Sequence, residues 1–144
     1  MLENRGKMEP MAPARVVSFS IGKPLHEVYE FLLRPENFAK WAFVGDTRMT
    51  NLGDGDWAVE TSVGPRILHF AARNASFVLT HTARIQPGDA PSVIPMRLMA
   101  NGDGTEMTYV FLPRPNLSDA EWVSMIEWVT ADLGALKSYL ENEL

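Results

Sequence analysis

Five polar side chains stand out among the apolar residues of the chain's strand-like segments: Arg48, Thr61, Arg66, His81 and Tyr109. When each segment is phased by the turn beside it, all five fall on the face that carries the alternating apolar residues. A buried polar group needs a hydrogen-bond partner or a ligand. These positions are therefore where the sequence could place chemistry.

His81 and Tyr109 are the candidate catalytic residues. An imidazole has an unperturbed pKa near neutrality, so His81 could act as a general acid or base, and Tyr109 could orient a ligand carbonyl. A structural role is the alternative for both, as a histidine hydrogen-bonded inside the sheet and a core aromatic residue. Arg66 and Arg48 could clamp a carboxylate at a cavity mouth, or they could simply be solvated at strand ends.

Other chemistries find little support in the sequence. His26, His69 and His81 are the only histidines and have no familiar metal-ligand spacing, and the chain lacks cysteine. There is no G-x-S-x-G motif, no P-loop and no pair of carboxylates on the proposed interior face. We therefore predict neither a metal site nor a cofactor.

Composition and charge narrow the classes of partner. A chain of 144 residues is most simply one domain, here residues 14–144 after a loose polar arm at 1–13. The net charge of −5 argues against binding to nucleic acid. No segment approaches the roughly 20 apolar residues of a membrane span, and no signal peptide is evident. We expect a cytoplasmic protein without stable membrane insertion.

The elements that would position these residues follow from periodicity. Residues 15–21 alternate as a half-buried strand, and residues 25–32 then place apolar side chains on one helical face. Pro35 ends this helix and a second short helix follows, with Phe38 and Trp41 on one face. Near the C-terminus, Ser118 and Glu121 form a capping box. A long helix to about Glu143 then carries an apolar stripe: Trp122, Ile126, Val129, Leu133, Leu136 and Leu140.

Between these helices the period changes to two. Turn signals divide the region into about six antiparallel strands, near 46–52, 56–62, 66–73, 76–86, 92–101 and 105–112. With the first strand this gives one curved sheet of about seven strands, on which the long helix should pack. Pro95 conflicts with a regular strand, so we expect a bulge or an unpaired edge there.

Each turn also predicts a register. A turn at Asn74-Ala75 sets Leu68 opposite His81 and Phe70 opposite Leu79. The turn at 101–104 pairs Leu98 with Met107, Met96 with Tyr109 and Ile94 with Phe111. The Gly-rich turn at 53–55 places Arg48, Thr50 and Leu52 on the face of Trp57, Val59 and Thr61.

The run "VSFSIGKPLHEVYEFLLRPENFAKWA", the hairpin "LGDGDW" and the amphipathic last helix resemble the START / Bet v 1-like (SRPBCC) superfamily, particularly its bacterial polyketide cyclase/dehydrase-like members. The resemblance covers about residues 14 to 143. It implies an α+β helix-grip fold, in which the two short helices form a V under the end of the long helix and a cavity lies between that helix and the sheet.

We therefore expect an internal pocket of roughly 300–1,000 Å³ that binds a small hydrophobic or aromatic molecule, lipid- or polyketide-like. A cyclase/dehydrase-type enzyme is the alternative. A partner-binding or quinone-chaperone-like protein is a second one, since Val110, Leu112, Trp128 and Tyr139 should face outward and could also support a homodimer. The predicted ligand-binding residues are Trp41, Val59, Arg66, Phe70, Leu79, His81, Met96, Leu98, Tyr109, Ile126, Val129 and Leu133.

Overall fold

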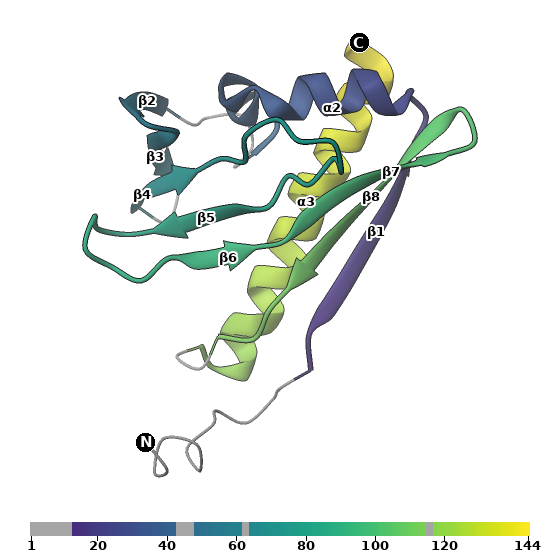
Figure 1. The fold of residues 1–144 in the computed structure, drawn as a ribbon. Coiled ribbons are helices and arrows are strands. Elements are labelled where there is room, and N and C mark those ends of the chain that lie inside the picture. The colour runs from purple at the N-terminus through teal and green to yellow at the C-terminus, as the bar shows by residue number, and fades with distance from the viewer. Residues whose placement is uncertain (1–12, 43–47, 62–63, 115–116) are drawn as a thin grey trace, which may run out of the picture.

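The computed structural model describes residues 13–42, 48–61, 64–114 and 117–144, so most of the predicted arm lies outside the described residues. The fold is α+β, with antiparallel strands and a long C-terminal helix (Figure 1). The described strands form two sheets, one of three strands in the order β1-β8-β7 and one of five in the order β2-β3-β4-β5-β6. The expected single sheet of about seven strands is therefore wrong.

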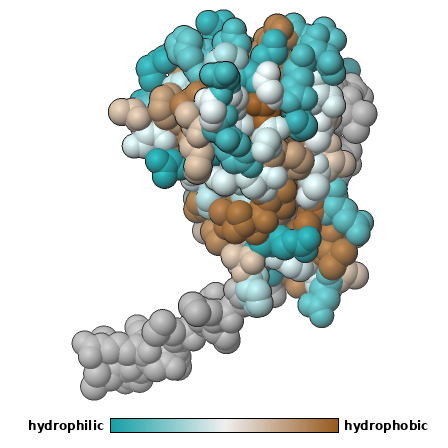
Figure 2. Space-filling view, turned by 90° about the vertical axis from the view of Figure 1, so that its right-hand side faces the viewer, coloured by the Kyte–Doolittle hydropathy of each residue, from teal (hydrophilic) through white to brown (hydrophobic). Residues whose placement is uncertain are grey.

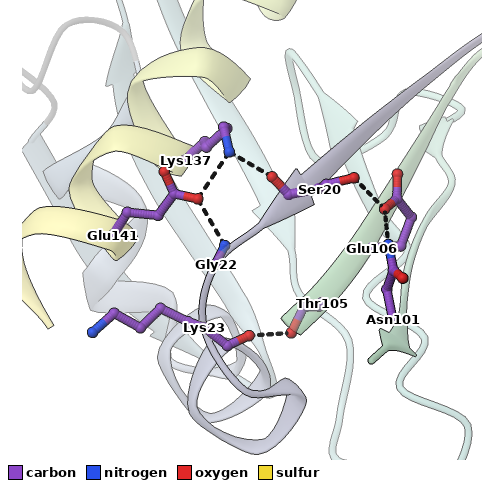
Figure 3. A network of polar contacts seen from close by, with 8 residues as sticks. All are labelled: Ser20, Gly22, Lys23, Asn101, Thr105, Glu106, Lys137 and Glu141. Atoms are coloured by element: carbon purple, nitrogen blue, oxygen red, sulfur yellow. Dashed lines mark hydrogen bonds and ion pairs between the residues drawn. The ribbon is translucent and has the colours of Figure 1, made fainter. Parts of the chain in front are cut away.

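The three-stranded sheet follows its predicted register closely. It consists of β1 (Arg15–Ile21), β7 (Met96–Asn101) and β8 (Gly104–Phe111). Met96 pairs with Tyr109 and Leu98 with Met107, as the turn predicts. On its outer face, Glu106 accepts hydrogen bonds from Ser20 and Asn101 (Figure 3). Glu106 also accepts one from Ser18, and these bonds link all three strands.

Pro95 is the point at which the chain passes from one sheet to the other. Strand β6 (Ser92–Ile94) belongs to the five-stranded sheet, and β7 begins one residue after the proline. Because Pro95 has no N–H, it cannot continue the ladder, although its carbonyl accepts a 3.1 Å bond from the Val110 N–H. Ile94 consequently pairs with His81, and the predicted pairing of Ile94 with Phe111 is wrong.

The five-stranded sheet also contains β2 (Arg48–Gly53), β3 (Asp56–Thr61), β4 (Gly64–His69) and β5 (His81–Arg84). Its first hairpin has an irregularity between Asn51 and Gly53, and Arg48 pairs with Glu60. The register differs by one residue from the predicted one, which moves Arg48 and Thr50 to the opposite face from Val59. The prediction that Arg48 faces the interior is therefore wrong.

Residues 70–80 form a loop where the turn at Asn74 predicted a continuous hairpin. The Asn74 side chain donates to the carbonyls of Ala72 and Val78 and accepts from the N–H groups of Ser76 and Val78. These bonds replace ladder bonds, and Leu79 instead donates its N–H to the Met96 carbonyl at 2.8 Å.

The register of the strands beyond this loop is shifted by two residues. Leu68 pairs with Ala83 rather than His81, and no ladder pairs Phe70 with Leu79. Because the shift is an even number, His81 keeps its predicted interior face.

Two short helices follow β1, as predicted. Helix α2 (Leu25–Leu33) ends at Arg34, whose ψ of 114° is extended, and Pro35 begins the 3-10 helix η1 (Pro35–Lys40). The extended residue before the proline separates the two helices.

Helix α3 (Asp119–Glu143) starts with the predicted capping box at Ser118 and Glu121. Its Leu133, Leu136 and Leu140 are fully buried against the apolar faces of α2 and the three-stranded sheet. On its exposed side, Lys137 donates to the Ser20 carbonyl, and Glu141 accepts from the Gly22 N–H (Figure 3). These contacts fix the last turns of α3 against the end of β1.

Candidate functional site

A cavity of about 980 Å³ lies between the five-stranded sheet and α3. The end of β8 and the residues after it form a third wall, and η1 with Trp41 and Ala42 forms a fourth. Its volume falls at the upper end of the expected range. Apolar and aromatic residues dominate the lining: Phe38, Trp41, Ala42, Leu68, Ala83, Ile94, Tyr109, Val110, Phe111, Leu112, Met125, Trp128, Val129 and Leu133.

The structure divides the predicted ligand-binding residues into three groups. Six of them line the cavity: Trp41, Arg66, His81, Tyr109, Val129 and Leu133. Phe70, Leu79 and Met96 line a small adjoining pocket of about 30 Å³, to which Trp41 and His81 also contribute. Val59, Leu98 and Ile126 are buried in the protein core and are not among the lining residues of either space.

His81 occupies the wall shared by the two spaces. Its side chain projects from the first residue of β5, and the residue is only 9% exposed. The Phe70 ring stacks on it at 5.8 Å, and the Phe38 ring meets it edge-on at 6.4 Å. Burial lowers the His81 pKa to about 4, although a hydrogen bond to the Leu79 carbonyl opposes this shift. The imidazole is therefore neutral at physiological pH.

Tyr109 contributes a neutral phenol to the cavity wall formed by β8. Burial raises its pKa to about 12. The charge of Arg114 lowers this pKa slightly and that of Asp132 raises it slightly, and both residues line the cavity. Its ring packs against Phe111 at a centroid distance of 4.8 Å. The hydroxyl therefore keeps its proton over the whole physiological range and can donate a hydrogen bond.

The arginines differ in their surroundings. Arg66 pairs with Val59 across the ladder and donates from Nη1 to the Pro65 carbonyl at 2.8 Å. Arg84 also borders the cavity, but its guanidinium pairs at 3.2 Å with Asp56, which pairs in turn with His69 on the outer face. Of these two arginines, Arg66 is therefore the one on the interior face of its strand.

Sequence reasoning missed several lining residues and gave three apolar residues the wrong environment. Val110 and Trp128, expected to face outward, line the cavity instead, whereas Leu112 borders the cavity and is also 41% exposed, as expected. Tyr139 packs against Phe31 at a ring-centroid distance of 5.4 Å. Consecutive residues lie 100° apart on a helical wheel, so the narrow stripe through Val129 gave no signal that Trp128 also lines the cavity.

Part of the apolar surface remains exposed. Figure 2 shows a face that is largely hydrophilic over its upper part, with apolar side chains gathered lower down. Val16, Met99, Leu112 and Val123 are among the large apolar residues that the structure leaves exposed. Leu112 alone of these four also borders the cavity.

Within the described ranges, no group of three or more histidine, cysteine, aspartate or glutamate side chains could hold a metal ion. Among the same residues, no helix has the length and apolar character needed to cross a membrane.

Comparison with known proteins identifies the fold. No protein-family model matches the chain, and no curated protein matches it in sequence. Among solved structures, protein CV1439 from Chromobacterium violaceum has a TM-score of 0.70 at 16% identity, covering 93% of this chain and all of that one.

Two further structures share the fold. The Aha1 dimer from Colwellia psychrerythraea has a TM-score of 0.69 at 14% identity, covering 91% of this chain and 98% of that chain. DynU16, a putative protein in the dynemicin biosynthetic locus, has a TM-score of 0.62 at 18% identity over 91% of this chain. The chain spans about half of DynU16, covering 48% of its length.

Proposed function

We propose that this protein is a helix-grip protein of the START / Bet v 1-like type that binds a small hydrophobic or aromatic molecule in the cavity. The carrying observation is the cavity itself, about 980 Å³ in volume and lined mainly by apolar and aromatic side chains. Ligand sites of this kind combine an apolar wall with a few polar groups that fix orientation. Here Arg66, His81 and Tyr109 supply those groups.

The fold comparisons support the same proposal. DynU16 and Aha1 share this architecture of antiparallel strands and a C-terminal helix, and the residues that resemble the superfamily form β1, α2, η1 and α3. A lipid- or polyketide-like molecule of modest size would fit the volume. A homodimer stays a prediction.

A cyclase/dehydrase-type reaction is the second candidate, because His81 and Tyr109 line the same cavity. The protonation states favour binding over this reaction. A general base works best when its pKa lies near the working pH, whereas burial lowers the His81 pKa to about 4. His81 would thus be a weak base at neutral pH, although its neutral ring can still form hydrogen bonds.

Titration with the uncharged fluorescent probe N-phenyl-1-naphthylamine tests the binding proposal. We expect saturable uptake by the folded protein, and Val129→Trp should weaken it by about tenfold because the indole fills cavity volume. Val123→Trp is the matched control, since Val123 lies on the same helix, is 52% exposed and is not a lining residue. Absence of uptake, or equal uptake by both variants, would contradict the proposal.

A further inference from the structure

The two ring nitrogens of His81, Nδ1 and Nε2, have different surroundings. The other ring nitrogen, Nδ1, lies 3.4 Å from the Leu79 carbonyl oxygen, which can only accept a hydrogen bond. The proton of the neutral ring is therefore assigned to Nδ1. This leaves Nε2 as a lone-pair acceptor that requires a donor.

No described residue supplies that donor. The aromatic neighbours Phe38 and Phe70 have no polar hydrogen, and no hydrogen bond joins Nε2 to the described part of the protein. Among those residues, every buried side-chain nitrogen or oxygen has a partner, so Nε2 must lie on an accessible surface. The spaces that His81 borders are the cavity and the small pocket beside it.

We propose that the ligand is an uncharged hydroxy compound, phenol- or alcohol-like, whose O–H donates a hydrogen bond to Nε2 of His81. This inference rests on the proposed function and adds a ligand class to it. An ether or ketone oxygen could not satisfy Nε2, because both groups would be acceptors. A carboxylate would bring negative charge to the same lone pair.

The surroundings of the His81 ring strengthen the preference for a ligand that donates a hydrogen bond. The low pKa of His81 keeps the ring neutral and Nε2 unprotonated at pH 7. A ligand without a donor would cover Nε2 and leave a buried polar atom unsatisfied, which is more costly than the gain from an ordinary hydrogen bond. Sites that hydrogen-bond a hydroxyl reject analogues lacking it for this reason.

Three bicyclic probes at pH 7 test the inference: 2-naphthol, its methyl ether 2-methoxynaphthalene, and naphthalene. By hydrophobicity alone the two compounds without a hydroxyl should bind more tightly than 2-naphthol. We expect the opposite order in the wild-type protein, with 2-naphthol favoured about fivefold or more in calorimetric titrations. Naphthalene is the control for size, because it is smaller than 2-naphthol and cannot clash.

The His81→Phe variant identifies the residue responsible. Phenylalanine keeps an aromatic ring beside Phe38 and Phe70, and we expect it to abolish or reverse the preference for 2-naphthol. Binding of all three probes with no preference for 2-naphthol in the wild type would overturn the inference, for example because a water molecule satisfies Nε2. An unchanged preference in folded His81→Phe would overturn it too.

Failure of all three probes to bind would instead defeat the proposed function. If the variant does not fold, the order of the three probe affinities in the wild-type protein still tests the inference.

Discussion

At the scale of single residues, His81 is buried, yet its Nε2 atom can still accept a hydrogen bond. Its ring contacts both Phe38 and Phe70, and burial lowers its pKa to about 4 from an ordinary value of 6.5. The unfolded chain therefore binds a proton in a pH range where the folded chain does not. The free energy of unfolding should therefore fall as the pH drops from about 6.5 towards 4. Above that range, the titration of His81 does not affect it.

The size of this effect can be measured by urea unfolding at pH 7 and pH 4.5. We expect the wild type to lose about 2 kcal/mol more than His81→Phe between these two values, from the shift that burial imposes on His81. The carboxylates titrate in both proteins, so comparing them isolates the imidazole. Identical losses in the two proteins would show that His81 is not buried in a neutral form.

Single residues also set the limits of the sequence prediction. The strong local signals gave correct results: the capping box at Ser118 starts α3, and Pro35 ends α2. Asn74 was misread, because its side chain bonds four local backbone groups and makes a loop where a tight hairpin turn was expected. Such bonds depend on side-chain geometry that the residue type does not reveal.

At the scale of elements, α3 carries both the core and one wall of the cavity. Leu133, Leu136 and Leu140 are fully buried, while Val129, one turn before Leu133, faces the cavity. The period of the apolar residues predicted this stripe correctly. It did not reveal that Trp128 and Met125 extend the helix's apolar face into the cavity wall, because this depends on how far the sheet stands from the helix.

Truncation of the stripe gives a stability test. Leu133→Ala should destabilise the protein by about 2–5 kcal/mol, because a fully buried side chain loses its contacts and leaves a void. Val123→Ala on the same helix removes a side chain that is 52% exposed and should be nearly neutral. Denaturant unfolding measures both. Equally mild effects would mean that α3 does not pack as described.

Strand registers were predictable only where the turn is tight and regular. The turn between β7 and β8 correctly predicted the pairs Leu98–Met107 and Met96–Tyr109. In contrast, the irregularity near Gly53 shifted β2 by one residue and moved Arg48 to the outer face. Pro95 was recognised as a conflict, but the sequence did not show that the chain changes sheets there. Each of these outcomes depends on contacts between distant segments, which a local pattern does not contain.

At the scale of the whole molecule, the two sheets and α3 leave an apolar space between them. The three-stranded sheet packs closely on the C-terminal half of α3 (Figure 1). The five-stranded sheet and the end of β8 border the cavity along the middle turns of α3. Six of the twelve predicted residues line the cavity and three line the small adjoining pocket, whereas Val59, Leu98 and Ile126 belong to the core. The alternation of a strand predicts which face is apolar, but not which part of that face is covered by the helix.

The most direct test of ligand binding in this cavity is a methyl-resolved NMR titration with naphthalene. We predict saturable shifts at the methyl groups of Leu68, Ala83, Val129 and Leu133, all of which line the cavity. Val16, Met99 and Val123, which are exposed and are not lining residues, should stay unchanged. Shifts confined to those exposed methyl groups, or no shifts at all, would contradict the central claim that this cavity binds small apolar molecules.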